Sequence, residues 1–449
     1  MSFDGKIAIE NEWQSWARLT GKKGAEAAVA QVAILNAGSK IRRRLRLRTE
    51  PFRFRGSADG IQFQASGLAG SLSLKEVSLE IVPKFVSRSE QLPVWNTSTL
   101  FLLEALAGRH VISLLADRQQ WKSHRVVDLI AHAFADAVER GFSDRPIHTY
   151  RQNEVSSVAL RGRLNIARQI RNQVHAPHIL ECDVDELDAE NPFNDVLKWA
   201  AETLSACAVE PVLKRQLGEI AHAFPGRADR SVVHRHHRLL PPPQFQAWSD
   251  ALELAHLLSS GLTLSSNGGR TSGYSLLFNM ERAFERFVEV VLTRIVRSIG
   301  SGELTTSRQQ SIKYGVATFI GGKNLHCRPD NVVRLNGVPA IVVDAKYKLL
   351  DGNLDDIEEA TGAPKSQDIY ELVAGMFAHD CRTGLLVYPA TNLPDAAPCQ
   401  LRTWKLNVYG KMIRVGALPV NLLNLRRKAG LTELLASVGE QIADFLDET

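Results

Sequence analysis

The sequence lacks the features that mark secreted, membrane-spanning and disulfide-bonded proteins. None of its apolar runs reaches the ~18 residues needed to cross a bilayer, and its first residues, MSFDGKIAIENEW, lack the basic and then apolar layout of a signal peptide. Its 5 cysteines are scattered without a CxxC pair, so neither a disulfide framework nor a structural zinc site is expected. We therefore expect a cytoplasmic protein that makes no membrane contact.

Two further absences concern nucleotides and charge. The chain has no G-x-x-x-x-G-K-[ST] loop, because the GGKN segment at 321–324 lacks both the upstream glycine and the final hydroxyl residue. We therefore expect this chain to bind no nucleotide itself. The formal net charge of +5 is small for 449 residues, so the total charge alone does not demand a nucleic-acid partner.

The length of the chain and its 44% hydrophobic content predict more than one domain. We predict an α+β multidomain fold in three parts. Residues 1–95 show short alternating patterns broken by Gly and Ser, which predict a β-rich domain that binds a partner. Residues 96–264 show helical spacing and predict a mainly helical region that also docks a partner. A Gly- and Ser-rich break at 265–273 opens the third part, residues 265–449, whose α-β-β-α-β order predicts an α/β domain with a mixed sheet.

The N-terminal part contains a dense group of arginines that alternate in part with Leu and Phe. This alternation predicts a strand with one cationic face, which could meet phosphates or an acidic partner protein. A solvated strand face explains the pattern equally well, so its role stays open. We call the group the arginine strip, and its members are Arg42, Arg43, Arg44, Arg46, Arg48, Arg53 and Arg55.

The segment 328–348, RPDNVVRLNGVPAIVVDAKYK, is the most informative part of the chain. Two runs rich in Val and Ile are joined by Asn336-Gly337, which is a strong hairpin signal. Asp330, Asp344 and Lys346 interrupt this apolar hairpin. Two carboxylates and a lysine in such a setting form the pattern of a metal-dependent nuclease.

The register of the hairpin decides whether these three side chains meet. A two-residue loop would pair Asp330 with Val343 and turn Asp330 and Asp344 to opposite faces of the sheet. A three-residue loop, or a bulge equivalent to it, places the two acids directly opposite each other with Lys346 on the same face. We predict this second register, in which the opposite, buried face holds Val333, Ile341 and Val343.

Hydrolysis of a phosphodiester needs a strong nucleophile and a counter-charge, and a divalent cation can supply both. Mg²⁺ prefers hard oxygen ligands, and Mn²⁺ could replace it. Asp330, Asp344 and the backbone carbonyl of Ala345 would form a sufficient open metal site. Lys346 would either orient the attacking water or stabilise developing negative charge, and the sequence does not separate these roles.

A predicted helix from about residue 276 offers a further acid. Glu281 and Glu285 lie one turn apart, so both can reach the same neighbourhood. We favour Glu285 as the residue that completes the metal site, because an acid beside the apolar residues Phe284 and Phe287 is costly to bury without a partner. The alternative for both glutamates is a solvated helix edge. The alternative for the hairpin acids is turn formation, or ion pairing with nearby basic residues.

These residues resemble the PD-(D/E)XK nuclease superfamily, and the surrounding chain resembles the McrC family, the nuclease subunit of the McrBC modification-dependent restriction system. The resemblance implies that residues 265–449 form the nuclease domain. It also implies that Asp330 and Asp344 are metal ligands, Lys346 is the catalytic lysine and Glu285 is the helical acid. The motifs in family order are LEIVPKF at 79–85, LRGRLNIARQIRN at 160–172, CDVDELDAENPFNDVLK at 182–198, MERAFERFV, DAKYK, QDIYELVAG and GLLVYP.

The chain departs from the family pattern at two positions in the helix after the hairpin. Relatives commonly carry a Gln and, four residues later, a Tyr, where this chain has Glu371 and Gly375. These side chains are thought to position the substrate or the metal in the family. The departures therefore leave undecided how this helix would contact the substrate or the metal. The two acids and the lysine of the family pattern are all present.

The resemblance also implies a partner. Proteins of this family act with a hexameric AAA+ GTPase, McrB, which recognises methylated double-stranded DNA, and the region ahead of the nuclease docks onto this ring. We therefore expect a Mg²⁺-dependent DNA endonuclease subunit of a restriction system that stimulates its partner's GTP hydrolysis. Two other functions stay open. One is a regulatory activator with a vestigial nuclease site, and the other is a nuclease that acts alone.

Overall fold

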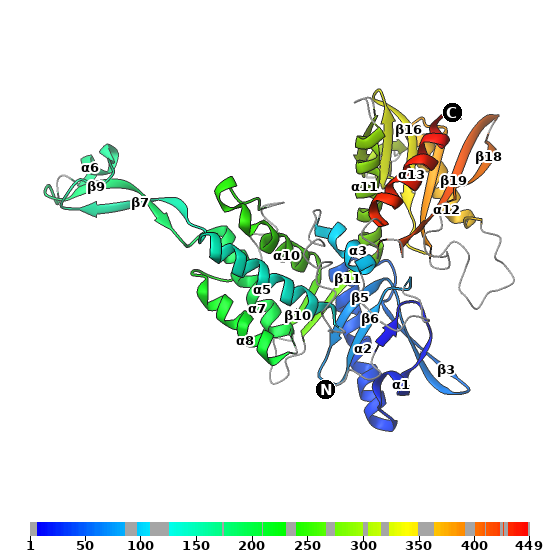
Figure 1. Ribbon diagram of the computed structural model, residues 1–449, viewed down its shortest axis with the longest axis horizontal. Coiled ribbons are helices and arrows are strands. Elements are labelled where there is room, and N and C mark those ends of the chain that lie inside the picture. Colours follow the sequence, from blue (N-terminus) through cyan, green and yellow to red (C-terminus); the bar gives the residue numbers. More distant parts are fainter. Residues whose placement is uncertain are drawn as a thin grey trace. The chain divides into compact units, whose positions relative to one another are not determined.

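The computed structural model of this chain is shown in Figure 1. It contains two compact units, of which the first combines Met1–Val126 with Ser260–Thr449 and the second is Val127–Ser259. Among the described residues, no helix is both long and apolar enough to span a bilayer. The structure describes residues 7–85, 97–107, 125–172, 175–208, 210–229, 239–265, 274–299, 304–315, 323–348, 363–390, 400–408, 410–422, 425 and 430–447.

The first unit contains a five-stranded sheet in the order β1-β6-β5-β11-β10. Its strands come from parts of the chain that are far apart in sequence, because β5 pairs antiparallel with β11. At this pairing Gly70 has a φ of 129°, and a side-chain carbon there would lie 2.2 Å from the carbonyl oxygen of Leu276, so only glycine permits the close approach. The strands are β1 (Ile7–Ile9), β5 (Leu68–Ser73), β6 (Ser78–Val82), β10 (Leu262–Ser265) and β11 (Tyr274–Asn279).

This sheet changes the predicted domain boundaries. The boundary drawn at residue 265 runs through it, because β10 and β11 complete a sheet begun by the N-terminal strands. The predicted helical region also includes α3 (Thr97–Ala107), which belongs to the first unit and packs on α11 (Met280–Ile299). Composition along the chain does not show that strands on either side of an inserted unit pair with each other. The boundary after residue 95 and most of the Gly- and Ser-rich break, 266–273, lie outside the described residues.

The predicted β-rich domain contains a long helix, α2 (Gly24–Leu45), where strands were expected. Ile34, Ile41 and Leu45 are buried at helical spacing and join a core that includes Trp16. The expectation of mostly strands is wrong here because the apolar residues recur every three to four positions rather than every two. The helix packs near a three-stranded sheet in the order β2-β4-β3. It contacts α1 (Trp16–Thr20), β3 (Phe52–Ser57) and β10, and the other strands of the three-stranded sheet are β2 (Gln14–Ser15) and β4 (Gly60–Ala65).

The arginine strip does not form the predicted single strand. Its first three members lie in the last turn of α2, where positive charge complements the helix dipole. Arg46 caps that helix in the left-handed conformation, with a φ of 55°. Arg48 lies in the connection that follows, and the last two members lie on β3. The prediction of one cationic strand face is therefore wrong.

The C-terminal part of the first unit contains a six-stranded sheet in the order β12-β15-β16-β17-β19-β18. β16 runs parallel to β17 and β17 parallel to β19, while the remaining neighbours are antiparallel. The predicted mixed sheet is present, and the coarse α+β multidomain class is confirmed. The strands are β12 (Leu304–Arg308), β15 (Asn331–Leu335), β16 (Val338–Ala345), β17 (Thr383–Ala390), β18 (Arg402–Val408) and β19 (Lys411–Asn421), and a separate pair is formed by β13 (Ile312–Gly315) and β14 (Leu325–Cys327).

Helices cover both faces of this mixed sheet (Figure 1). On one face α12 (Ser366–Ala378) packs through Leu372 and Met376 against Val342 of β16. On the other face α11 and α13 (Gly430–Asp447) line one small apolar space with strands β17 and β19. Strands buried on both sides are mostly apolar, so an acid such as Asp344 near the end of β16 stands out from its strand.

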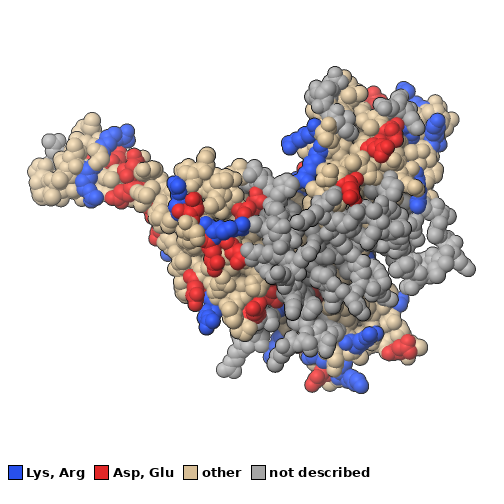
Figure 2. All heavy atoms as spheres, viewed as in Figure 1, with Lys and Arg blue, Asp and Glu red and all other residues tan. Residues whose placement is uncertain are grey.

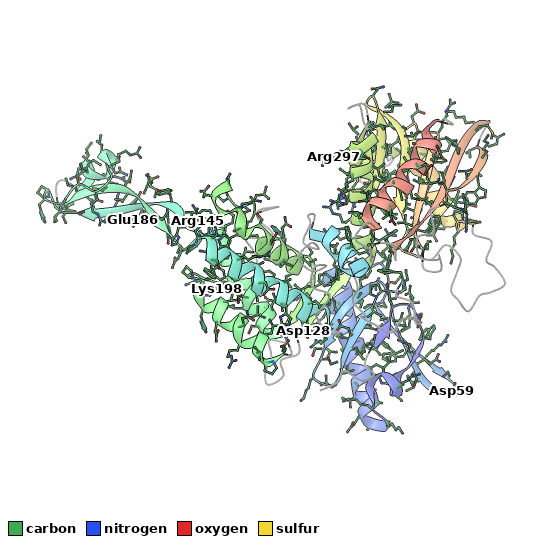
Figure 3. The ribbon with its side chains drawn as sticks, viewed as in Figure 1. Asp59, Asp128, Arg145, Glu186, Lys198 and Arg297 are labelled. Carbon is green, nitrogen blue, oxygen red and sulfur yellow. The ribbon has the colours of Figure 1, made fainter. Side chains whose placement is uncertain are left out.

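The second unit is mainly helical, as predicted, but it also contains a long β ribbon. β7 (Thr149–Ser157) pairs with β9 (Leu180–Asp188) along its full length, and the short β8 (Arg163–Leu164) pairs with β9 beside it. Acidic and basic side chains are interspersed on this ribbon (Figure 2). Glu186, labelled in Figure 3, accepts a hydrogen bond from Asn153 at 3.0 Å. The helices are α5 (Val126–Asp144), α6 (Ile166–Asn172), α7 (Pro192–Cys207), α8 (Pro211–Ala223), η1 (Pro243–Trp248) and α10 (Ser249–Ser260).

Candidate active site

The β15–β16 hairpin has the predicted register, reached through a bulge. Leu335 pairs with Val338 across a two-residue turn, in which Asn336 and Gly337 have φ angles of 51° and 80°. Such left-handed pairs form the turn that matches strand twist. The pairing then shifts by one residue, which leaves Ala340 without a partner in the ladder. The three-residue loop is therefore wrong, and the equivalent bulge is confirmed.

Beyond the bulge the two acids come to lie opposite each other. Asn331 pairs with Val343, so the next positions along the two strands are Asp330 and Asp344. The predicted buried face is found, since Val333, Ile341 and Val343 are all at most 1% exposed. The face that carries the acids is also apolar away from the strand ends, because Val332 and Val342 are both 0% exposed. The acids therefore lie at the rim of a packed sheet.

Asp330 is held by the backbone of the opposite strand. Its Oδ2 accepts a hydrogen bond from the Ala345 N–H at 2.9 Å. Burial, followed by the negative charges of Asp344 and Glu285, raises the pKa of Asp330 to about 8. The carboxylates of Asp330, Asp344 and Glu285 repel one another, and a cation between them would reduce this repulsion. The donor set therefore fits a hard divalent ion, with Asp330, Asp344 and the Ala345 carbonyl as the groups that would hold it.

Lys346 lies between two carboxylates. Its Nζ is 2.8 Å from Asp344 Oδ2 and 2.5 Å from Glu371 Oε2. Burial lowers the pKa of Lys346, but the charges and hydrogen bonds of Asp344 and Glu371 raise it, and the net shift is upward. Lys346 is therefore a fixed ammonium group beside the two hairpin acids.

The two departures from the family pattern lie in the wall of this site. Glu371 bonds Lys346, and the hydrogen bond from Lys346 holds the pKa of the Glu371 carboxyl below its usual range. Its second oxygen accepts a hydrogen bond from Gln367 at 3.2 Å. Gly375 lies one turn further along α12, where a side-chain carbon would be 3.4 Å from Val342 Cγ1. Glu371 thus holds the Lys346 side chain in place, and Gly375 adds no side chain to this part of the cleft lining.

Glu285 lies near the hairpin acids but does not complete a preformed metal cluster. Burial is the largest cause of its raised pKa, which Arg48 partly offsets and Glu281 and Asp344 increase. Arg48 is 3.8 Å from Glu285 and 3.6 Å from Glu281. Within the described part of the chain, no three His, Cys, Asp or Glu side chains are spaced to hold a metal ion. Glu285 as a third ligand therefore stays a prediction.

Asp330, Asp344 and Lys346 line a cleft with a volume of about 290 Å³. Arg48 and Arg328 contribute positive charge to its lining, and Tyr314 contributes an aromatic ring. The sequence does not predict the approach of Arg48 to this cleft, because the other lining residues are more than 260 positions away along the chain. The cleft is lined by Arg48, Tyr314, His326, Cys327, Arg328, Pro329, Asp330, Val342, Asp344, Lys346, Glu371, Leu372, Ala374 and Gly375.

The fold and this cleft together define an α+β multidomain protein that presents two acids and a lysine in one polar cleft. A family model described as "McrBC 5-methylcytosine restriction system component" matches residues 63–389. The match spans most of the chain, and the chain belongs to this family. The predicted resemblance to the McrC family is therefore confirmed.

Two solved structures from Thermococcus gammatolerans are similar to this chain, and the one with the higher TM-score shares its fold. A chain of the half-complex from a tetradecameric assembly of McrB AAA+ hexamers with bound McrC is 18% identical, with 97% of this chain and 99% of that chain covered and a TM-score of 0.63. A chain of the McrBC complex is also 18% identical, with 65% of this chain and 87% of that chain covered and a TM-score of 0.47. Among curated proteins, none matches this chain.

Proposed function

We propose that this chain is the Mg²⁺-dependent DNA endonuclease subunit of a McrBC-like restriction system. The observation that supports it most is the meeting of Asp330, Asp344 and Lys346 at one rim of the mixed sheet, with Lys346 2.8 Å from Asp344. The hairpin needs a bulge to bring the acids together. Packing of the sheet does not require the two acids and the lysine to meet. A metal-dependent hydrolysis of a phosphodiester does need acids that meet to hold the ion.

The residues of the cleft have separable roles in such a reaction. Asp330, Asp344 and the Ala345 carbonyl would hold the divalent ion, which lowers the pKa of a bound water and offsets charge on the phosphate. Lys346 keeps a fixed positive charge beside the scissile phosphate and stabilises negative charge as it develops. Arg48 and Arg328 lie in the cleft lining, where they would attract the phosphates of the DNA backbone.

The chain has no nucleotide-binding loop motif of its own, so nucleotide hydrolysis would be the task of a partner. The solved relative with the higher TM-score contains McrB AAA+ hexamers with bound McrC, and we propose an equivalent AAA+ GTPase hexamer for this chain. The end of the β7–β9 ribbon offers a docking surface in the second unit. Four apolar side chains there are exposed by 61% to 80%: Val158, Leu160, Ile166 and Ile170. Exposed apolar groups gathered at one place are typical of protein interfaces.

The test is a cleavage assay with the purified chain, its AAA+ partner, GTP and Mg²⁺ on methylated and unmethylated plasmid DNA. We expect cleavage of the methylated plasmid only when all components are present, and its loss on chelation of the metal. Cleavage with Mg²⁺ alone would replace this proposal with a nuclease that acts without a partner. Stimulated GTP hydrolysis without any cleavage would replace it with a regulatory activator.

A further inference from the structure

A buried cluster joins the N-terminal sheet to the strand end that carries Lys346. Its members are Glu10, which follows β1, Lys84, which follows β6, and Tyr347, which follows Lys346. The Tyr347 hydroxyl donates a hydrogen bond to Glu10 Oε2 at 2.7 Å. Lys84 Nζ donates to the Tyr347 carbonyl at 2.6 Å and lies 3.9 Å from the centroid of the Tyr347 ring. We call these three residues the brace.

The brace also reaches the helix that carries Glu285. The second carboxylate oxygen of Glu10 accepts a hydrogen bond from the Gly67 N–H at 2.9 Å. The Gly67 carbonyl in turn accepts from the N–H of Met280, the first residue of α11, at 3.2 Å. One buried carboxylate from the N-terminal region is thereby connected both to the residue after Lys346 and to the start of α11, the helix that carries Glu285.

The members of the brace depend on each other because Glu10 and Tyr347 are buried and Lys84 is half-buried. Glu10 is 0% and Tyr347 is 9% exposed, and the Tyr347 ring also packs 5.9 Å from that of Phe284. Burial raises the pKa of Glu10 and lowers that of Lys84, so each charge relies on the other. Removal of one partner leaves a buried polar group without compensation. Such a cluster holds one geometry firmly, and it lies one residue from Lys346.

We propose that Glu10, Lys84 and Tyr347 are positioning residues that align Lys346 for DNA cleavage. The inference rests on the proposed nuclease function. Tyr347 fixes the backbone on one side of Lys346, and the Lys346 N–H bonds the Val387 carbonyl at 2.8 Å on the other. The N-terminal sheet is therefore part of the support of the active site, although it lies far away in sequence.

The substitution Tyr347→Phe tests this role, because it removes the hydrogen bond to Glu10 and keeps the ring. We expect the kcat for cleavage to fall about 10- to 100-fold, since small misplacements of a catalytic group have effects of this size. The KM for DNA and the stimulation of the partner GTPase should not change. The matched control is Tyr388→Phe, which removes a buried hydrogen bond, 3.0 Å long, from Tyr388 of β17 to Asp368 of α12. A fall in kcat of equal size in the control would overturn the proposal.

A second measurement follows Lys346 without relying on cleavage. Lys346 has a side chain only 9% exposed, so an amine-reactive reagent read by mass spectrometry should label it slowly in the parent protein. We expect faster labelling of Lys346 in Tyr347→Phe and in the milder Glu10→Gln, and no change in Tyr388→Phe. Unchanged labelling in all variants would overturn the brace. If the parent protein labels as expected but never cleaves DNA, the proposed function fails and the brace still stands.

Discussion

Lys346 shows how the site works at the scale of single residues. Its ammonium group is shared between Asp344, a proposed metal ligand, and Glu371, which is 48% exposed at the rim of the cleft. The sequence identified the lysine and both acids, because polar residues that interrupt an apolar hairpin stand out. It could not show that Glu371 bonds the lysine, since that contact joins two elements through a geometry that the spacing does not encode.

The substitution Glu371→Gln should leave DNA cleavage largely intact. Glutamine keeps an oxygen that can accept the hydrogen bond from Lys346 and loses only a partly solvated charge pair. Pairs of this kind contribute about 0 to 1 kcal/mol, which corresponds to at most about a fivefold change in rate. The measurement is kcat on methylated plasmid with the partner and GTP. A loss of more than about 100-fold would mean that Glu371 acts directly on the substrate or the metal.

At the scale of elements, the β15–β16 hairpin decides whether the two acids meet. Its turn and its facing acids were predictable because strand side chains alternate strictly, so only some loops and bulges allow the acids to meet. The choice between a longer loop and a bulge depended on the local backbone and could not be predicted. The helix α2 was missed because arginines and leucines near residue 45 imitate strand alternation at the end of a helical pattern.

Deletion of Ala340 should preserve cleavage. Ala340 has no partner in the β15–β16 ladder, and its removal turns the bulge into a regular strand that continues from the same two-residue turn. Val333 then still faces Ile341, and Asp330 still faces Asp344. We expect kcat within about tenfold of the parent protein, because only a local kink is lost.

The control for this deletion is insertion of one alanine after Ala340, because the bulge accommodates one extra residue and a second one shifts the register. A shifted register turns Asp344 away from Asp330, so cleavage should be lost while the protein still folds, as judged by circular dichroism. Loss of cleavage in the deletion variant as well would contradict the account, since it would make the bulge itself part of the site.

At the scale of the whole molecule, the main feature is the division of the chain into two units. One unit contains the mixed sheet together with the N-terminal sheet, and the other is a helical insertion with an exposed ribbon. The helical region was predictable from its apolar period, and the family could be inferred from ordered motifs. The shared N-terminal sheet was not predictable, because pairing between distant strands such as β5 and β11 leaves no local pattern.

The variant Val158→Ser/Leu160→Ser should weaken binding of the AAA+ partner. These side chains are 80% and 61% exposed, so the folded chain loses little packing when they are replaced. If the partner buries both, each contributes roughly 1.5 to 3 kcal/mol, and the affinity should fall at least about 100-fold. Val32→Ser, at a residue 57% exposed on α2, is the matched control. Binding measured by calorimetry that is unchanged in the double variant would place the docking surface elsewhere.

The most direct test of the account is Asp344→Ala, assayed for two activities in the presence of the AAA+ partner. Loss of this acid removes a proposed metal ligand and the anchor of Lys346, so DNA cleavage should fall by more than about 100-fold. Stimulation of the partner GTPase should survive, because the site lies in the mixed sheet and not on the ribbon. Asp59→Ala, at an exposed turn marked in Figure 3, should change neither activity. Unchanged cleavage by Asp344→Ala would contradict the assignment of this cleft as the nuclease site.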